Sequence, residues 1–324
     1  MAETRYVRAV NRALKDAMDA DSSVILLGED IATAGGSFKA TRDLLQDFGP
    51  ERVYDTPIAE AAITGMAVGA ALSGLRPVAE IMFMDFITLS MDMLVNQAAK
   101  ARYMFGGQGS VPMVLRTPHG GSLSGGPQHS QCLEAWFAHV PGLKVVVPAT
   151  VEDAYGLLRA AIDDPDPVIV VENKALYAMK GDLPDQPAMA TIGEAATRRE
   201  GTDVTLVTYG AMLWTSLKAA EAAAAEGVSV EVIDLRSIQP WDEQAVLRSL
   251  EKTHRLLVVH EAVEAFGVGA EIAARMADIG FDELDAPIIR VAAPFSPVPF
   301  SPALEGEWRP SEPKILAAIS RLMA

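Results

Sequence analysis

The stretch DTPIAEAAITGMAVGAALSGLRPVAEIMF, residues 55–83, contains the pattern that decides the fold. Asp55-Thr56-Pro57 closes a short strand, a Gly- and Ala-rich helix follows, and the apolar run 76–83 predicts the next strand. Similar strand-like runs at 24–28, 112–117, 143–148 and 167–172 alternate with amphipathic stretches such as 85–104 and 150–163. Apolar residues fill almost every position of these runs, so both faces of the sheet should be covered. The sequence therefore predicts a parallel α/β sheet.

A polar, Pro-containing segment, KGDLPDQPAMATIGEA at 180–195, interrupts this alternation. A second series of strand-like runs follows it, at 203–210, 228–235, 255–262 and 287–293, again with helical stretches between. The predicted organisation is two α/β domains, residues 1–185 and 186–324. In an open parallel sheet, ligand sites lie in the loops beyond the carboxyl ends of the strands.

Composition excludes some classes of function. The chain has 324 residues, half of them hydrophobic, and a formal net charge of -16, which argues against binding to nucleic acid. Its single cysteine, Cys132, excludes an internal disulfide and fits a reducing compartment. The N-terminal residues are charged, and the uncharged, Gly-rich stretch 61–75 is shorter than the ~20 residues of a membrane span. A cytoplasmic protein that binds neither nucleic acid nor membrane is expected.

Two loops contain candidate catalytic residues. Glu60 lies in the first turn of the helix after Pro57, where a carboxylate either complements the helix dipole or, if desolvated by the apolar segments around it, performs chemistry. His129 lies in the run 119–136, where a Gly- and Ser-rich loop leaves a strand and enters a helix close to this histidine. The run is equally consistent with a functional loop and with a flexible surface connection that carries a solvated histidine. His119 and His260 lie at strand ends, and a role for either stays open.

Longer motifs resemble one known family. They are GED (28–30), DTPIAEAAITGMAVGAA (55–71), RPVAEIMFMDF (76–86), NQAAKARYMFGG (96–107), QHSQCLEAWFAHVPGLKVVVPAT (128–150) and DLRSIQPWDEQAV (234–246). Together they resemble the β subunits of the first component of 2-oxo acid dehydrogenase complexes, from near residue 5 to the C-terminus. The resemblance implies a pyrimidine-binding domain for thiamine diphosphate, followed by a transketolase C-terminal-like α/β domain.

The resemblance also implies roles for particular residues. The glutamate at Glu60 hydrogen-bonds the aminopyrimidine ring of thiamine diphosphate and drives proton transfer, which is acid–base work by a carboxylate. Phe86 matches the aromatic position that packs on that ring. His129 belongs to the site of acyl transfer to a lipoyl group. Glu29 matches an acidic residue of the polar tunnel between two active sites, although a solvated loop carboxylate is the alternative.

Metal ions and partners follow from the same resemblance. A structural potassium ion is expected at Asp164 and Asp166 with the backbone carbonyls near Val111 and Val114, although DDPDP is also an ordinary turn. The sequence contains no GDG motif for the diphosphate and its divalent metal. An α subunit should therefore supply most of the Mg²⁺ site, in a heterotetramer of two α and two β chains. The acidic C-terminal domain is expected to dock the lipoyl acyltransferase core.

The substrate is less defined. RYMFGG (102–107), ALYAMKGDLPDQ (175–186) and APFSPVPFSPALE (293–305) are most similar to acetoin dehydrogenase β subunits, with pyruvate and branched-chain 2-oxo acids as alternatives. Two rival functions are a self-sufficient transketolase-like enzyme and a non-catalytic nucleotide-binding module. The first is disfavoured by chain length and the missing GDG motif. The second finds little support, because the Gly267–Gly269 pair has Ile272 where a dinucleotide fingerprint has its third glycine.

Overall fold

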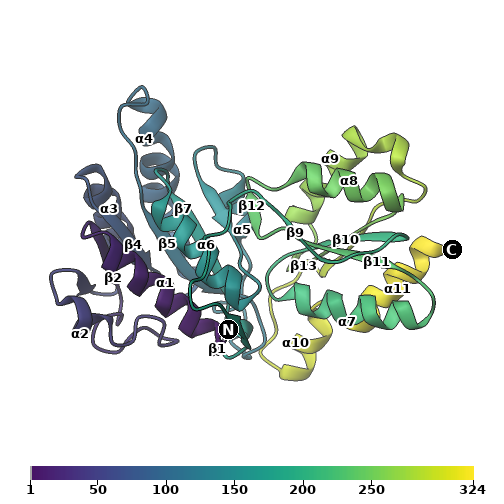
Figure 1. Ribbon diagram of the computed structural model, residues 1–324, viewed down its shortest axis with the longest axis horizontal. Coiled ribbons are helices and arrows are strands. Elements are labelled where there is room, and N and C mark those ends of the chain that lie inside the picture. The colour runs from purple at the N-terminus through teal and green to yellow at the C-terminus, as the bar shows by residue number, and fades with distance from the viewer. Residues whose placement is uncertain (1) are drawn as a thin grey trace. The chain divides into compact units, whose positions relative to one another are not determined.

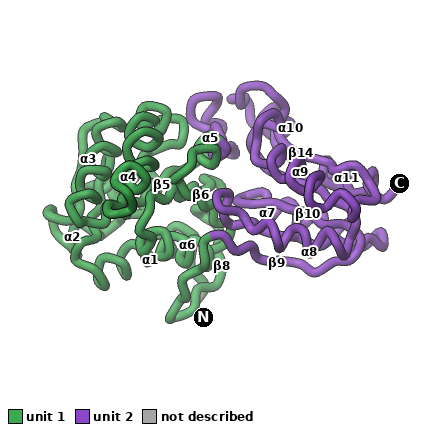
Figure 2. The backbone as a smooth tube through the Cα atoms, turned by 90° about the horizontal axis from the view of Figure 1, so that it is seen from above, with its two compact units in different colours: residues 1–119, 136–192 green, residues 120–135, 193–324 purple. Residues whose placement is uncertain are grey.

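The computed structural model describes residues 2–324, which form two compact units. Unit 1 contains residues 2–119 and 136–192, and unit 2 contains residues 120–135 and 193–324 (Figure 2). The domain boundary predicted after residue 185 lies within unit 1. Helix α5 (Glu134–Ala138) begins in unit 2 and ends in unit 1.

Unit 1 is an α/β layer structure (Figure 1). Its other elements are, in chain order, β1 (Ala2–Arg5), α1 (Tyr6–Ala20), β2 (Val24–Gly28), α2 (Leu44–Phe48), β3 (Val53–Asp55), α3 (Glu60–Leu72), β4 (Arg76–Glu80), the 3₁₀ segment η1 (Met84–Ser90), the π-helical η2 (Met93–Ala98), α4 (Ala99–Met104), β5 (Val114–His119), β6 (Lys144–Val146), α6 (Val151–Asp163), β7 (Val168–Asn173), η3 (Lys174–Leu176) and β8 (Lys180–Leu183).

The main sheet of unit 1 is parallel. Within the unit its strand order is β6-β7-β5-β4-β2-β3, and Leu26 of β2 aligns with Val53 on one side and Val78 on the other. Every residue of β2, β5 and β7 is buried, which explains why these strands are mainly apolar, with few polar or charged side chains among them. Helix α1 packs along α6 through buried residues at helical spacing. Away from this sheet, β1 pairs antiparallel with β8.

Unit 2 has a five-stranded sheet in the order β14-β13-β10-β11-β9. Figure 1 shows α7 and α11 on one side of this sheet and α8 and α9 on the other. The elements are β9 (Ala196–Arg199), β10 (Val204–Thr208), α7 (Met212–Ala225), β11 (Val230–Asp234), β12 (Ser237–Gln239), α8 (Glu243–Thr253), β13 (Leu256–Val263), α9 (Val268–Ile279), η4 (Phe281–Glu283), β14 (Ile289–Ala293), α10 (Pro302–Trp308) and α11 (Glu312–Met323).

These sheets confirm the predicted α/β class, with two local differences. The amphipathic stretch 85–104, which suggests one helix, is divided into 3₁₀, π-helical and α-helical parts, and π-helical turns are frequent near functional sites. Strand β9 pairs antiparallel with β11, so the second sheet has an antiparallel edge. Among residues 2–324, no helix combines the length and the apolar character needed to cross a membrane.

Candidate functional site

Three predicted residues of unit 1 follow the carboxyl ends of neighbouring strands. Glu29 follows β2, Glu60 follows β3, and Phe86 follows β4, and these strands are adjacent in the order β4-β2-β3. The carboxyl edge of a parallel sheet is where such folds place ligand sites. The structure therefore gathers the three residues at the edge where a cofactor is expected.

Glu60 is a buried carboxylate without a partner. It is the first residue of α3 and is 9% exposed. Its backbone carbonyl accepts a hydrogen bond from the Ser90 hydroxyl at 2.8 Å, which fixes the start of the helix against η1. Within residues 2–324 its carboxylate makes no hydrogen bond or ion pair. Burying a carboxylate without a partner costs folding free energy, so this side chain is not there to stabilise the fold.

The charge of Glu60 affects the pKa of Glu29. Burial raises the pKa of Glu29, and the neighbouring carboxylates Asp30 and Glu60 raise it further. The loop that starts here is anchored by Asp55, whose carboxylate accepts the backbone N–H groups of Ala32 at 2.7 Å and Thr33 at 3.2 Å. Glu29 and Glu60 are thus two acidic side chains at one sheet edge, and the pKa of Glu29 responds to both burial and charge.

Phe86 ends a series of aromatic contacts. Its ring meets the edge of Phe83 at 5.9 Å, and Phe83 in turn meets Phe38 at 6.2 Å. Phe38 stacks on Tyr177 at 4.7 Å. The Phe86 side chain is only half-buried, so it keeps a surface that can pack against a flat ligand.

A buried ion network joins strands β4, β5 and β7 and was not predicted from the sequence. Arg116 of β5 donates to Glu80 of β4 at 2.6 Å, and to both carboxylate oxygens of Glu172 of β7 at 2.7 and 2.8 Å. Tyr177 donates its hydroxyl to Glu172 at 2.7 Å. Arg116 and both carboxylates are almost fully buried. The available signal was a charged residue inside each of three otherwise apolar strand runs.

Burial and neighbouring charges shift the pKa values of Arg116, Glu80 and Tyr177 for different reasons. Burial opposes the charge of Arg116, but Glu172 and Glu80 raise its pKa, so it stays protonated. Burial raises the pKa of Glu80 more than Arg116 lowers it, with Glu172 adding to the rise. Burial and then Glu172 raise the pKa of Tyr177, which keeps its hydroxyl as a donor. The network carries two carboxylates and one guanidinium, and burial raises the pKa of the Glu80 carboxylate despite its contact with Arg116.

The predicted potassium ligands lie at the amino ends of β5 and β7. Asp164 receives both of its ion-pair contacts from Lys144, at 2.6 and 2.8 Å, and Asp166 pairs with Arg102 at 2.5 Å. Val111 and Val114 are buried beside the start of β5. Both carboxylates thus have a cationic partner within the protein, and the potassium site stays a prediction.

His129 belongs to unit 2, in the Gly- and Ser-rich segment 120–135 (Figure 2). Its side chain is half-buried, and its backbone N–H donates to the Gly126 carbonyl at 3.4 Å. The segment is not a loose connection, because buried carboxylates of unit 2 accept hydrogen bonds from its backbone. Glu261 accepts from Gly121 at 2.6 Å, and Glu305 accepts from Ser122 at 2.9 Å.

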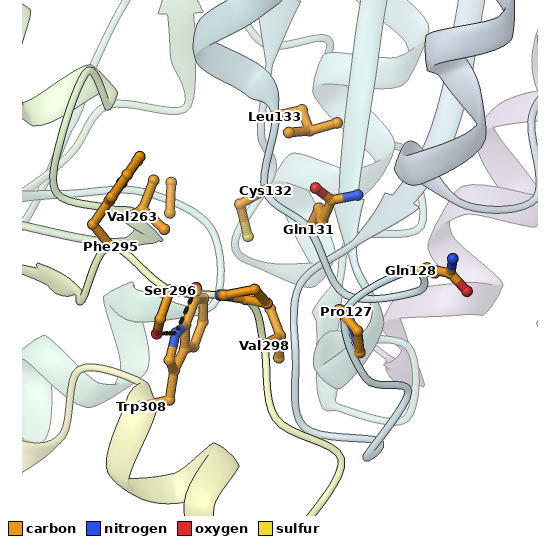
Figure 3. A pocket seen from close by; sticks show the side chains of 12 residues that line it. Pro127, Gln128, Gln131, Cys132, Leu133, Val263, Phe295, Ser296, Val298 and Trp308 are labelled. Atoms are coloured by element: carbon orange, nitrogen blue, oxygen red, sulfur yellow. Dashed lines mark hydrogen bonds between the residues drawn. The ribbon is translucent and has the colours of Figure 1, made fainter.

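The residues on either side of His129 line a cavity of unit 2 with a volume of about 510 Å³. Figure 3 shows Gln128, Gln131 and Cys132 on one wall and Val263, Phe295 and Trp308 around the others. Trp308 donates its indole N–H to the carbonyl and hydroxyl oxygens of Ser296 at 3.1 and 3.2 Å, drawn as dashed lines in Figure 3. The cavity is mainly apolar, and His129 itself is not among its lining residues.

His260, left open by the sequence, is a core residue. It is fully buried in β13, and its ring stacks on Tyr209 at 6.1 Å. Burial lowers the pKa of His260 to about 4, with a smaller opposing effect of the Ala262 backbone. The imidazole is therefore neutral near pH 7.

Comparison with known families matches both halves of the chain. Residues 2–180 match the transketolase pyrimidine-binding domain, and residues 193–315 match the transketolase C-terminal domain. Among solved structures, a split-gene transketolase in an inactive β4 tetramer superposes with a TM-score of 0.81, covering 98% of this chain and 97% of that one. Its sequence identity is 21%, so this likeness concerns the fold.

Curated relatives are similar over the whole chain. The acetoin:2,6-dichlorophenolindophenol oxidoreductase subunit beta of Bacillus subtilis is 46% identical, over 97% of this chain and 96% of its own length. The 2-oxoisovalerate dehydrogenase subunit beta of the same organism is 43% identical, over 99% of each chain. Its pyruvate dehydrogenase E1 component subunit beta is 41% identical, over 100% of this chain and 99% of its own.

Proposed function

Because the chain belongs to the family of β subunits of thiamine diphosphate-dependent 2-oxo acid and acetoin dehydrogenases, we propose that it forms one half of such an enzyme. With an α subunit it decarboxylates or cleaves its substrate and passes the acyl group to the lipoyl group of an acyltransferase core. Acetoin is the first substrate to test, on the strength of the segments at 102–107, 175–186 and 293–305.

Glu60 is the observation that carries this proposal. A buried carboxylate that makes no hydrogen bond or ion pair within residues 2–324 fits a ligand that offers it a polar ring nitrogen. When bound, thiamine diphosphate supplies an electron sink for the carbon–carbon bond that breaks. Glu60 would hold the aminopyrimidine ring and exchange a proton with its nitrogen, and Phe86 would pack on the ring face. Glu29, whose pKa is raised by burial, would act in the polar tunnel between two active sites.

The remaining roles rest on the family pattern and on local geometry. His129 is proposed to act in acyl transfer to the lipoyl group. A potassium ion at 111–114 and 164–166 would bind mainly through backbone carbonyls, because Asp164 and Asp166 already pair with Lys144 and Arg102. The α subunit would hold the diphosphate and Mg²⁺ in a heterotetramer of two α and two β chains. We place this assembly in the cytoplasm, with unit 2 docking the acyltransferase core.

Co-expression with a candidate α chain tests the proposal. The purified complex should reduce an artificial dye acceptor in the presence of thiamine diphosphate, Mg²⁺ and one substrate among acetoin, pyruvate and branched-chain 2-oxo acids. Acetoin should give the highest kcat/KM. Preference for a 2-oxo acid would correct the substrate and leave the enzyme class intact, whereas inactivity with all of them would refute the function.

The chain by itself provides a second test. Titration calorimetry of the isolated chain should show weak binding of thiamine diphosphate that depends little on Mg²⁺, since half of the cofactor's contacts come from another polypeptide. Tight, Mg²⁺-dependent binding together with full turnover by the isolated chain would contradict the half-site arrangement.

A further inference from the structure

The segment before His129 has a strained backbone conformation. Ser122 has φ +83° and Ser124 has φ +53°, both in the left-handed region that residues with a side chain rarely adopt. Such conformations persist only where the surrounding structure determines them. The contacts that stabilise this backbone conformation should therefore influence the position of His129, which follows the segment.

Two buried carboxylates of unit 2 supply those contacts. Glu305 of α10 is 4% exposed, and its two oxygens accept the N–H groups of Ser122 at 2.9 Å and Ser124 at 3.3 Å. Glu261 of β13 is 3% exposed and accepts the N–H of Gly121 at 2.6 Å. Three backbone donors of one short segment thus end on two acids.

The charges of the two acids are compensated differently. Arg309 lies 3.1 Å from Glu261 and forms an ion pair with it. Glu305 has no ion-pair partner among residues 2–324, so backbone N–H groups provide the contacts that stabilise its buried charge. Hydrogen bonds from N–H groups to a carboxylate are stronger than those to a neutral acceptor. The backbone N–H groups of Ser122 and Ser124 thus stabilise the buried Glu305 carboxylate, and the same hydrogen bonds stabilise the strained backbone of the segment.

Packing carries this constraint to His129. At Gly121 an added Cβ would lie 2.9 Å from the Glu305 carboxylate, so the backbone is pressed against the acid. At Gly125 an added Cβ would lie 3.2 Å from the Cβ of His129. At Gly126 it would overlap the ring of Phe300, at 2.2 Å. The Glu305 carboxylate therefore packs against the backbone at Gly121, and the Phe300 ring packs against it at Gly126.

We propose that Glu305, assisted by Glu261, is a positioning residue for His129. It holds the segment 121–126 in the strained conformation that presents the imidazole, and it does not itself touch the reacting groups. The inference rests on the proposed role of His129 in acyl transfer to the lipoyl group.

The test uses the complex with the α subunit and compares two half-reactions. Glu305→Gln keeps one acceptor oxygen but turns an NH₂ group toward the second backbone donor. Acylation of a lipoyl domain should fall about tenfold in kcat with little change in KM, because a displacement of about 1 Å can cost this much or more. Dye reduction, which needs no lipoyl group, should stay within about twofold of the unmodified complex.

Two further variants keep the test sharp. Glu307→Gln changes an exposed glutamate of the same helix and should leave both half-reactions unchanged. Gly121→Ala pushes the segment away from the acids without altering them, and it should reproduce the loss seen with Glu305→Gln. Thermal unfolding of each complex shows whether folding is affected.

The outcomes separate the possible failures. Normal lipoyl acylation in Glu305→Gln would overturn the inference. An equal fall of both half-reactions, accompanied by a lower Tm, would also overturn it, since this indicates a general structural role. If the unmodified complex reduced no dye with any substrate, the proposed function itself would have failed.

Discussion

Unit 1 buries carboxylates in two contrasting ways at one edge of its sheet. Glu80 and Glu172 share Arg116, so their charges are met by a cation and by hydrogen bonds inside the protein. Glu60 is also buried, but its carboxylate has no partner within residues 2–324. Removing the cation from a paired acid would leave a buried charge uncompensated, which ties the pair to the arrangement of the strands. For the unpaired acid we propose that a ligand supplies the missing partner.

Replacing the unpaired acid should have the largest effect, and on activity alone. Glu60→Gln removes the proton exchange while keeping the size of the side chain, so dye reduction by the complex should fall at least 100-fold, within the ~10²–10⁴ range of acid–base groups. The Tm should not fall, because no internal contact is lost. Retention of more than roughly a tenth of the turnover would contradict the assignment.

Breaking the paired acids should affect stability first. Arg116→Met leaves two buried carboxylates without their cation, and such losses cost about 3–5 kcal/mol. Urea unfolding of the chain would measure this change. The matched control is Arg12→Met, because Arg12 is half exposed and pairs with Asp16 on the surface of α1. That pair should contribute at most about 1 kcal/mol. Similar losses in both variants would mean that the network is not special.

His260 sharpens the comparison because it is buried in its neutral form. Its pKa falls from 6.5 to about 4 in the folded chain, so the folded state resists a proton that the unfolded state accepts. The contribution of neutral His260 to the free energy of unfolding is fully present above pH 6.5 and is lost as the pH falls toward 4. Between pH 7 and pH 5 the loss should be about 2 kcal/mol in urea unfolding. His260→Phe should flatten that part of the profile; an unchanged slope would show that other groups cause it.

A further comparison concerns the outer member of the network, Tyr177. Tyr177→Phe removes one hydrogen bond to the Glu172 carboxylate and should cost about 1.5–3 kcal/mol at most, since a charged acceptor is involved. Tyr6→Phe, which removes a 3.1 Å bond to the neutral carbonyl of Pro148, should cost about 1 kcal/mol. A larger loss for Tyr6→Phe would indicate that Glu172 does not need its third donor.

The strands and the first-named site residues were predictable for a physical reason. A strand covered on both faces leaves a continuous apolar run, so 24–28 is recovered residue for residue as β2. The position of Glu60 at the start of a helix is predictable because a helix that follows a short strand is a local pattern. The Arg116 network was missed because it depends on register. Glu80 and Arg116 are direct neighbours only once β4 aligns with β5. The acids that hold residues 121–124 were missed for the same reason, as they come from β13 and α10.

Phe300 resting on Gly126 has a consequence for how this chain can change during evolution. The ring occupies the space where any side chain at position 126 would begin, and Gly126 also has φ +70°. Whether a substitution at position 126 or 300 is sterically tolerated therefore depends on the residue at the other position. In aligned homologues, positions 126 and 300 should covary: a bulky ring at 300 requires glycine at 126. Lineages with a small residue at 300 are the ones in which Asn, which tolerates positive φ, can replace that glycine.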